Sequence, residues 1–265
     1  MKRAVLAALI AQRPEREKAL IEQVDVGAPP FDFEGGVVSM GERLKAVHPS
    51  WIVELLTPYT HDEASLFAAA YTRRVGSALP DIPALKEARV RALDCAEHHL
   101  LTTLFKTICP PEYLAYHPLR QLATCGRTAL IGVIDFLGLR DLARELPYIV
   151  RARHMRAIER SFSEQQLAFM RRIAKEGEPI RFPRLRIDGW DGNEESLKKQ
   201  LHIRGLLRLA KALYGCERSL LWYVTRTLDT TRGRYVEAHC TKTRQTRAHQ
   251  TLITQVAELL KEVAA

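Results

Sequence analysis

Apolar residues recur every three to four positions along most of this chain, which is the period of a helix with one buried face. The longest example covers residues 84–108, whose apolar positions include Leu85, Val90, Leu93, Leu100, Leu101, Leu104 and Ile108. Near residue 180, apolar residues alternate instead with basic ones, so a short strand stays open as an alternative there. The pattern predicts an all-α fold, with helical hairpins packed in one large or two smaller helical domains.

Capping signals and prolines divide this pattern into individual helices. Ser39, Thr60 and Ser163 are each followed three residues later by Glu or Gln, which is the spacing of a capping box. Prolines end helices because they lack a backbone N–H donor. The predicted helices cover residues 2–12, 15–24, 39–48, 50–56, 60–73, 84–108, 119–137, 139–146, 148–162, 163–175, 194–213, 217–228 and 235–263.

Two stretches rich in glycine and proline mark the domain boundaries. Residues 27–36 contain three glycines and two prolines, and residues 176–193 contain three glycines and two prolines. We therefore predict N-terminal helices with a linker or arm over residues 1–36 and a helical domain over residues 37–178. A linker over residues 179–193 and a basic C-terminal helical domain over residues 194–265 complete this division.

Charge is spread unevenly along the chain, whose formal net charge is +9. Residues 179–265 hold 16 Lys and Arg against nine Asp and Glu, a net charge of +7, whereas residues 1–178 have a net charge of +2. Such an excess attracts phosphates, anionic lipid headgroups or an acidic protein partner. On charge alone, a solubilising surface is the preferred interpretation.

Cysteine usage and hydropathy indicate the compartment. The five cysteines are an odd number without close pairs, which favours a reducing cytoplasm over a disulfide framework. No stretch approaches the roughly 20 apolar residues of a membrane span. Residues 1–11 have a basic start and a short apolar run without a clear cleavage site, which favours a first amphipathic helix over a signal peptide.

Two groups of cysteine and histidine residues suggest chemistry. Cys95, His98, His99 and Cys109 lie within 15 residues and could be metal ligands. Only Cys95 and His99 share a helix face, and the chain after the helix would have to fold back to bring Cys109 to the same metal ion. Cys125 lies near a helix start, where a thiolate would be stabilised. Ordinary packing is the preferred interpretation for both. We predict no catalytic residue, no cofactor and no metal, and hence a protein that is not an enzyme.

Basic residues are arranged in a stripe on one predicted C-terminal helix. Arg204, Arg208 and Lys211 are spaced i, i+4 and i+7, so they share one helix face. Other basic residues extend this surface: Arg226, Arg232, Arg234, Lys242, Arg244 and Arg247. Such a stripe can release counterions from a phosphate backbone, which makes nucleic-acid binding the main alternative function. Trp222 and Tyr223 lie among apolar residues and are interpreted as core rather than as base-stacking residues.

Two segments resemble proteins of secretion and flagellar machinery. Residues 206–224 are similar in pattern to a helix pair of the flagellar motor switch protein FliG. The other segment resembles the His-Pro helix starts of type III secretion accessory proteins of the SctK/YscK type, and reads His48-Pro49-Ser50-Trp51-Ile52-Val53-Glu54-Leu55-Leu56. The resemblance implies a cytosolic adaptor that links the membrane ring of a type III secretion apparatus to its cytoplasmic sorting platform.

The leading hypothesis is therefore a structural adaptor, with nucleic-acid binding through the basic C-terminal helices as the alternative and an unrecognised enzyme third. Its expected partners are protein components of a secretion apparatus, and its expected place is the cytoplasm or the cytoplasmic face of the inner membrane. We expect Trp51 with Leu55, and Trp222 with Leu221, to lie in hairpin cores. The candidate partner-binding residues are His48, Trp51, Arg204, Arg208 and Lys211.

Overall fold

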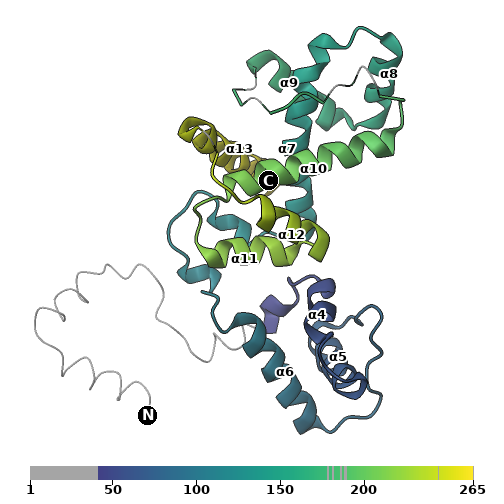
Figure 1. Ribbon diagram of the computed structural model, residues 1–265, viewed down its shortest axis with the longest axis vertical. Coiled ribbons are helices and arrows are strands. Elements are labelled where there is room, and N and C mark those ends of the chain that lie inside the picture. The colour runs from purple at the N-terminus through teal and green to yellow at the C-terminus, as the bar shows by residue number, and fades with distance from the viewer. Residues whose placement is uncertain are drawn as a thin grey trace, which may run out of the picture. The chain divides into compact units, whose positions relative to one another are not determined.

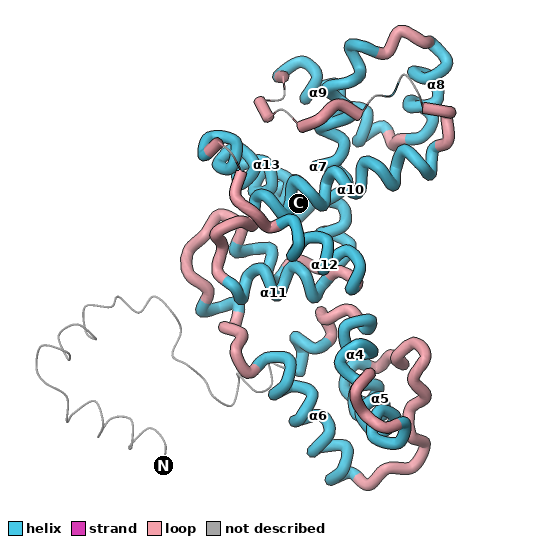
Figure 2. The backbone as a smooth tube through the Cα atoms, in the orientation of Figure 1, coloured by secondary structure: helices cyan, strands magenta, loops and turns pink. Residues whose placement is uncertain are grey.

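Helices account for the regular structure of the chain. The computed structural model describes residues 41–177, 179–180, 182–185, 187, 190–243 and 245–264. Within these ranges the regular elements are α-helices and short 3-10 helices, without a strand (Figure 2). The predicted all-α fold is confirmed. The predicted helices over residues 2–24, the arm up to residue 36, the capping residue Ser39 and the basic residue Arg244 lie outside the described residues.

The helices follow one another along the chain (Figure 1). The α-helices are α4 (Pro49–Leu56), α5 (His61–Val75), α6 (Val90–Phe105), α7 (Arg127–Glu145), α8 (Ala152–Ser161), α9 (Glu164–Glu176), α10 (Glu194–Ala212), α11 (Arg218–Thr227), α12 (Thr230–His239) and α13 (Thr246–Ala264). Three 3-10 helices lie between them, namely η1 (Pro111–Tyr113), η2 (Arg120–Thr124) and η3 (Leu146–Tyr148). Long loops join α5 to α6 and α9 to α10 (Figure 1).

Capping side chains fix several helix starts where the sequence predicts them. Thr60 and Glu63 form a complete capping box at the start of α5, and Ser163 with Gln166 forms another at α9. Each box satisfies backbone N–H groups that have no partner within the helix. The capping prediction at these two positions is confirmed.

Several predicted helix boundaries are wrong. The helix predicted from residue 84 begins only at Val90, and the one predicted from residue 148 begins at Ala152. The separate helices predicted over residues 119–137 and 139–146 are η2 followed by one continuous helix, α7. The single helix predicted over residues 235–263 is two helices, α12 and α13. Helix α12 begins after Asp229, whose carboxylate accepts a hydrogen bond from Arg232 N at 3.1 Å and so caps the helix.

Helix α7 is the centre of the packing and contacts α9, α10 and α13. Its middle and C-terminal half are buried, and α10 crosses it closely in Figure 1. Two glycines permit the close crossing. A Cβ atom on Gly138 of α7 would lie 2.7 Å from the Leu201 carbonyl carbon of α10, and one on Gly205 would lie 2.7 Å from the Ile134 carbonyl carbon. The crossing joins helices on either side of the predicted linker, and Ser39–Ala265 form one compact unit.

We expect Gly205→Ala to lower the free energy of unfolding by about 1–3 kcal/mol, because the added methyl group would force α7 and α10 apart. The measurement is urea denaturation followed by circular dichroism. Gly126→Ala is the matched control, because a Cβ atom at Gly126 meets no atom within 4 Å. It should change the free energy by less than about 1 kcal/mol. Equal values for the two variants would contradict the close crossing.

Candidate partner-binding site

His48 and Trp51 join α4 to the pair formed by α11 and α12. The His48 backbone N–H donates to Arg226 O at 2.8 Å, and Trp51 Nε1 donates to Leu228 O at 2.8 Å. The Arg226 guanidinium lies 3.7 Å from the Trp51 ring centroid, a cation–π distance. Trp51 is only 7% exposed. The predicted core position of Trp51 is confirmed, and both residues make contacts within the chain.

A histidine and a serine lie in hydrogen-bond contact at this joint. His48 Nδ1 and Ser50 Oγ are 2.8 Å apart, and Ser50 Oγ accepts a hydrogen bond from Thr230 N at 3.0 Å. Burial, and next the positive charge of Arg127, lower the pKa of His48. The neutral imidazole therefore caps α4 while Ser50 holds the start of α12. This pair connects two helix starts, which is a structural role.

The basic residues of α10 do not form one exposed stripe, which corrects the surface that their spacing suggested. Arg208 is fully buried and contacts Asp141 at 2.6 Å. Arg204 is partly buried and donates to Pro183 O at 2.8 Å. Lys211 is also partly buried and donates to Thr241 Oγ1. The common face of these residues is turned toward neighbouring segments, so Arg208 is not available to a partner in this structure.

Cys95, His98 and His99 of α6 line one pocket, and Cys109 is not among its lining residues. His99 of α6 contacts the Tyr59 hydroxyl at 2.8 Å. Cys109 N donates to Ser219 Oγ at 2.9 Å, so Cys109 belongs to a contact with α11. Among the described residues, no group of three or more metal-ligating side chains is placed to hold an ion. Burial raises the pKa of the Cys125 thiol, which disfavours the thiolate that a nucleophile needs.

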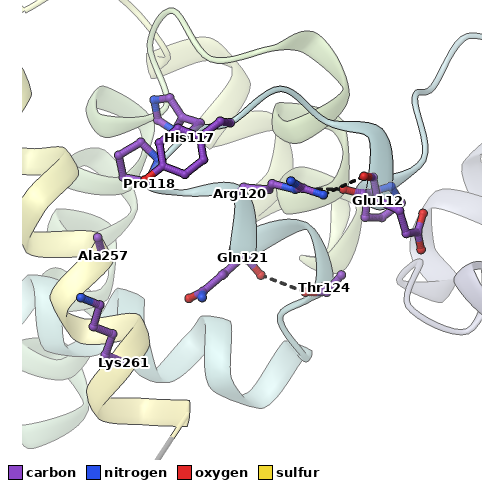
Figure 3. A pocket seen from close by; sticks show the side chains of 10 residues that line it. Glu112, His117, Pro118, Arg120, Gln121, Thr124, Ala257 and Lys261 are labelled. Carbon is purple, nitrogen blue, oxygen red and sulfur yellow. Dashed lines mark hydrogen bonds between the residues drawn. The ribbon is translucent and has the colours of Figure 1, made fainter. Parts of the chain in front are cut away.

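A pocket of about 610 Å³ lies between α13 and the segment that contains η1 and η2 (Figure 3). Its volume falls in the range of about 300–1,000 Å³ typical of ligand sites. We call it the α13 pocket, and the residues that line it are Pro111, Glu112, Tyr116, His117, Pro118, Arg120, Gln121, Thr124, Ala257 and Lys261.

The wall of the α13 pocket opposite α13 is held by hydrogen bonds of its own. The Arg120 guanidinium donates to Glu112 O at 2.7 Å and to Pro111 O at 3.3 Å. His117 Nδ1 accepts from Leu119 N at 3.1 Å, and burial lowers the pKa of His117, which keeps the ring neutral. These bonds fix the segment that contains η1 and η2, in which Pro111 and Pro118 cannot donate backbone hydrogen bonds.

The α13 pocket combines apolar surface with a few polar groups. Figure 3 shows Ala257 and Lys261 on α13 at one side, with Gln121 and Thr124 of η2 at the other. Tyr116 is almost fully exposed. The apolar walls of the pocket carry the Gln121 amide, the Thr124 hydroxyl and the Lys261 ammonium group. This combination suits an extended peptide that carries a carboxylate. The sequence alone does not predict this pocket, although Pro110, Pro111 and Pro118 signal an interruption of the α-helices.

Comparison of the chain with protein-family models, with curated proteins and with solved structures found no match. Among the described helices, none combines the length and the apolar character that crossing a membrane requires.

Proposed function

We propose that this chain is a protein-binding adaptor of a type III secretion apparatus, which links the membrane ring to the cytoplasmic sorting platform. The resemblance of residues 48–56 and 206–224 supports this proposal, and both segments adopt the local structure that it implies. His48 caps α4 with Pro49 at its first position, and residues 206–224 span the end of α10, a turn and α11. The partners that follow are protein components of the apparatus at the cytoplasmic face of the inner membrane.

The α13 pocket is the observation that carries the binding role. Its walls come from segments about 140 residues apart in sequence, so the fold has to form before the pocket exists. Tyrosine is enriched among the residues that dominate interface energies. The Lys261 ammonium group is exposed in the last turn of α13 and has no ion-pair partner among the described residues. A partner segment with an apolar residue and a carboxylate fits this combination.

We expect the combined variant Tyr116→Ala, Gln121→Ala and Lys261→Glu to reduce recovery of secretion-apparatus components at least tenfold. Removing a tyrosine anchor and reversing a charge together cost more than about 1.4 kcal/mol, which is a tenfold change in affinity. The measurement is affinity capture of the full chain from its native host, quantified by mass spectrometry. Lys175→Glu is the matched control, because Lys175 is also an exposed lysine in the last turn of a helix.

Two results would overturn this proposal. If the wild-type chain captures no secretion-apparatus component, the assignment to that apparatus is wrong. If the combined variant captures the same components as strongly as the Lys175→Glu control, the α13 pocket is not the binding site. Thermal unfolding of each variant checks that the change in capture does not come from a loss of folded protein.

A further inference from the structure

Helix α8 has one buried face and one strongly basic face. Its buried residues are His154, Ile158 and Ser161. Arg153, Arg156 and Arg160 are exposed, and we call them the arginine row. At 100° per residue these three arginines fall within an arc of about 60° on the side opposite the buried residues. They extend over about 10 Å along the helix axis at 1.5 Å per residue.

The arginine row carries positive charge that the described part of the chain leaves uncompensated. None of its three guanidinium groups forms an ion pair with a carboxylate there. Glu159 is the single acidic residue of α8, against these three arginines. Each guanidinium offers five N–H donors in a rigid fork that matches a carboxylate. A surface of this kind is complementary to a row of acidic side chains.

Exposed apolar side chains lie immediately before the arginine row in sequence. Val150 is 92% exposed and Tyr148 is 61% exposed. The guanidinium of Arg184 lies 4.4 Å from the centroid of the Tyr148 ring, so one face of the ring is occupied. The apolar side chain of an exposed valine makes no favourable contact with a phosphate backbone, but it adds apolar contact area to a protein interface. Aromatic residues and arginine are also enriched in such interfaces. This combination favours a protein partner over a nucleic acid.

We propose that the arginine row binds an acidic helical segment of a protein partner. Arg153, Arg156 and Arg160 are spaced i, i+3 and i+7. Carboxylates spaced i, i+4 and i+7 on an antiparallel partner helix would match them, and an apolar residue after the last carboxylate would contact Val150 and Tyr148. The surface is distinct from the α13 pocket, and an adaptor needs two surfaces to link two components. The arginine row binds its ligand whether or not the chain belongs to a secretion apparatus.

The test uses the full chain and a synthetic helical peptide with three glutamates at this spacing, followed by a leucine. Fluorescence anisotropy measures binding at about 150 mM salt, where exposed charges more than about 8 Å apart are largely screened. We expect the variant Arg153→Gln, Arg156→Gln and Arg160→Gln to bind the peptide at least tenfold more weakly than the wild type. Glutamine keeps good helix propensity, so α8 should persist.

The matched control is Arg91→Gln, Arg218→Gln and Arg247→Gln, which removes the same net charge from three exposed arginines on α6, α11 and α13. This scattered variant should bind the peptide as the wild type does. Equal weakening in both variants would show a non-specific effect of net charge and overturn the proposal. So would a wild-type dissociation constant weaker than about 1 mM, which corresponds to only about 4 kcal/mol.

A third arm titrates the same proteins with duplex DNA. The proposal expects weaker binding to DNA than to the peptide. Tighter binding to DNA that is lost in the arginine-row variant would replace the acidic protein segment by a nucleic acid as the ligand. If the arginine-row proposal is wrong, capture of partners through the α13 pocket is unaffected, because the arginine-row variant keeps Tyr116, Gln121 and Lys261. The two proposals therefore fail separately.

Discussion

Asp141→Ala should lower the free energy of unfolding by about 3–5 kcal/mol, because it removes a buried carboxylate from a buried arginine. Asp141 is 3% exposed and contacts Arg208, which is fully buried, at 2.6 Å. Arg204 lies 3.9 Å from the other carboxylate oxygen, so two positive charges lose the same counter-charge. The measurement is urea denaturation followed by circular dichroism, with the free energy extrapolated to water.

A second variant separates the charge from the packing. Replacing both partners, as Asp141→Leu with Arg208→Met, removes the charges together and should recover most of the lost stability. Arg208 also lies 4.7 Å from the Phe182 ring centroid, and methionine retains contact with that ring. Recovery in the double variant would show that the unpaired charge, rather than a cavity, destabilises Asp141→Ala.

An exposed ion pair provides the control for this experiment. Arg172 and Glu262 are 2.8 Å apart, but both side chains are more than 40% exposed. Glu262→Ala should change the free energy of unfolding by no more than about 1 kcal/mol, since water screens and replaces such a pair. If Asp141→Ala were as mild as Glu262→Ala, the interior position of the Arg208 pair would be contradicted.

Local signals were sufficient to predict the fold class and several helix starts. The Thr60 and Ser163 side chains accept hydrogen bonds from backbone N–H groups three residues later. Four consecutive residues therefore suffice to predict each of these helix starts. The predicted break near Gly138 was wrong because a glycine within a helix also permits the close approach of another helix. Distinguishing these two cases requires the position of α10, which lies more than 60 residues further along the chain. The sequence of α7 does not contain that information.

The basic stripe shows why site residues are harder to predict than helices. The i, i+4 and i+7 spacing correctly places Arg204, Arg208 and Lys211 on one face of α10, but spacing does not say what that face contacts. The partner of Arg208 is Asp141, 67 residues earlier. Asp141 and Glu145 of α7 each pair with an arginine from a distant segment. The α13 pocket was missed for the same reason.

Trp51→Ala should lower the free energy of unfolding by about 3–5 kcal/mol, the usual cost of removing a buried aromatic side chain. The ring packs on Gly233 of α12, where an added Cβ atom would lie 2.6 Å from Trp51 Cζ2. The change also leaves Leu228 O without the hydrogen bond from Trp51 Nε1. Thermal unfolding of the wild type and the variant measures the effect, which should exceed that of Trp222→Ala, because Trp222 is only partly buried.

Trp51→Phe divides this effect between packing and hydrogen bonding. Phenylalanine keeps most of the aromatic surface but donates no hydrogen bond to Leu228 O, so its loss of stability should be smaller than that of Trp51→Ala. The same variants also test Trp51 as a candidate partner-binding residue. An unchanged melting temperature together with loss of partner capture would make Trp51 an exposed interface anchor, contrary to its buried position in this fold. Loss of stability instead leaves Trp51 as the residue that holds α4 to α11 and α12.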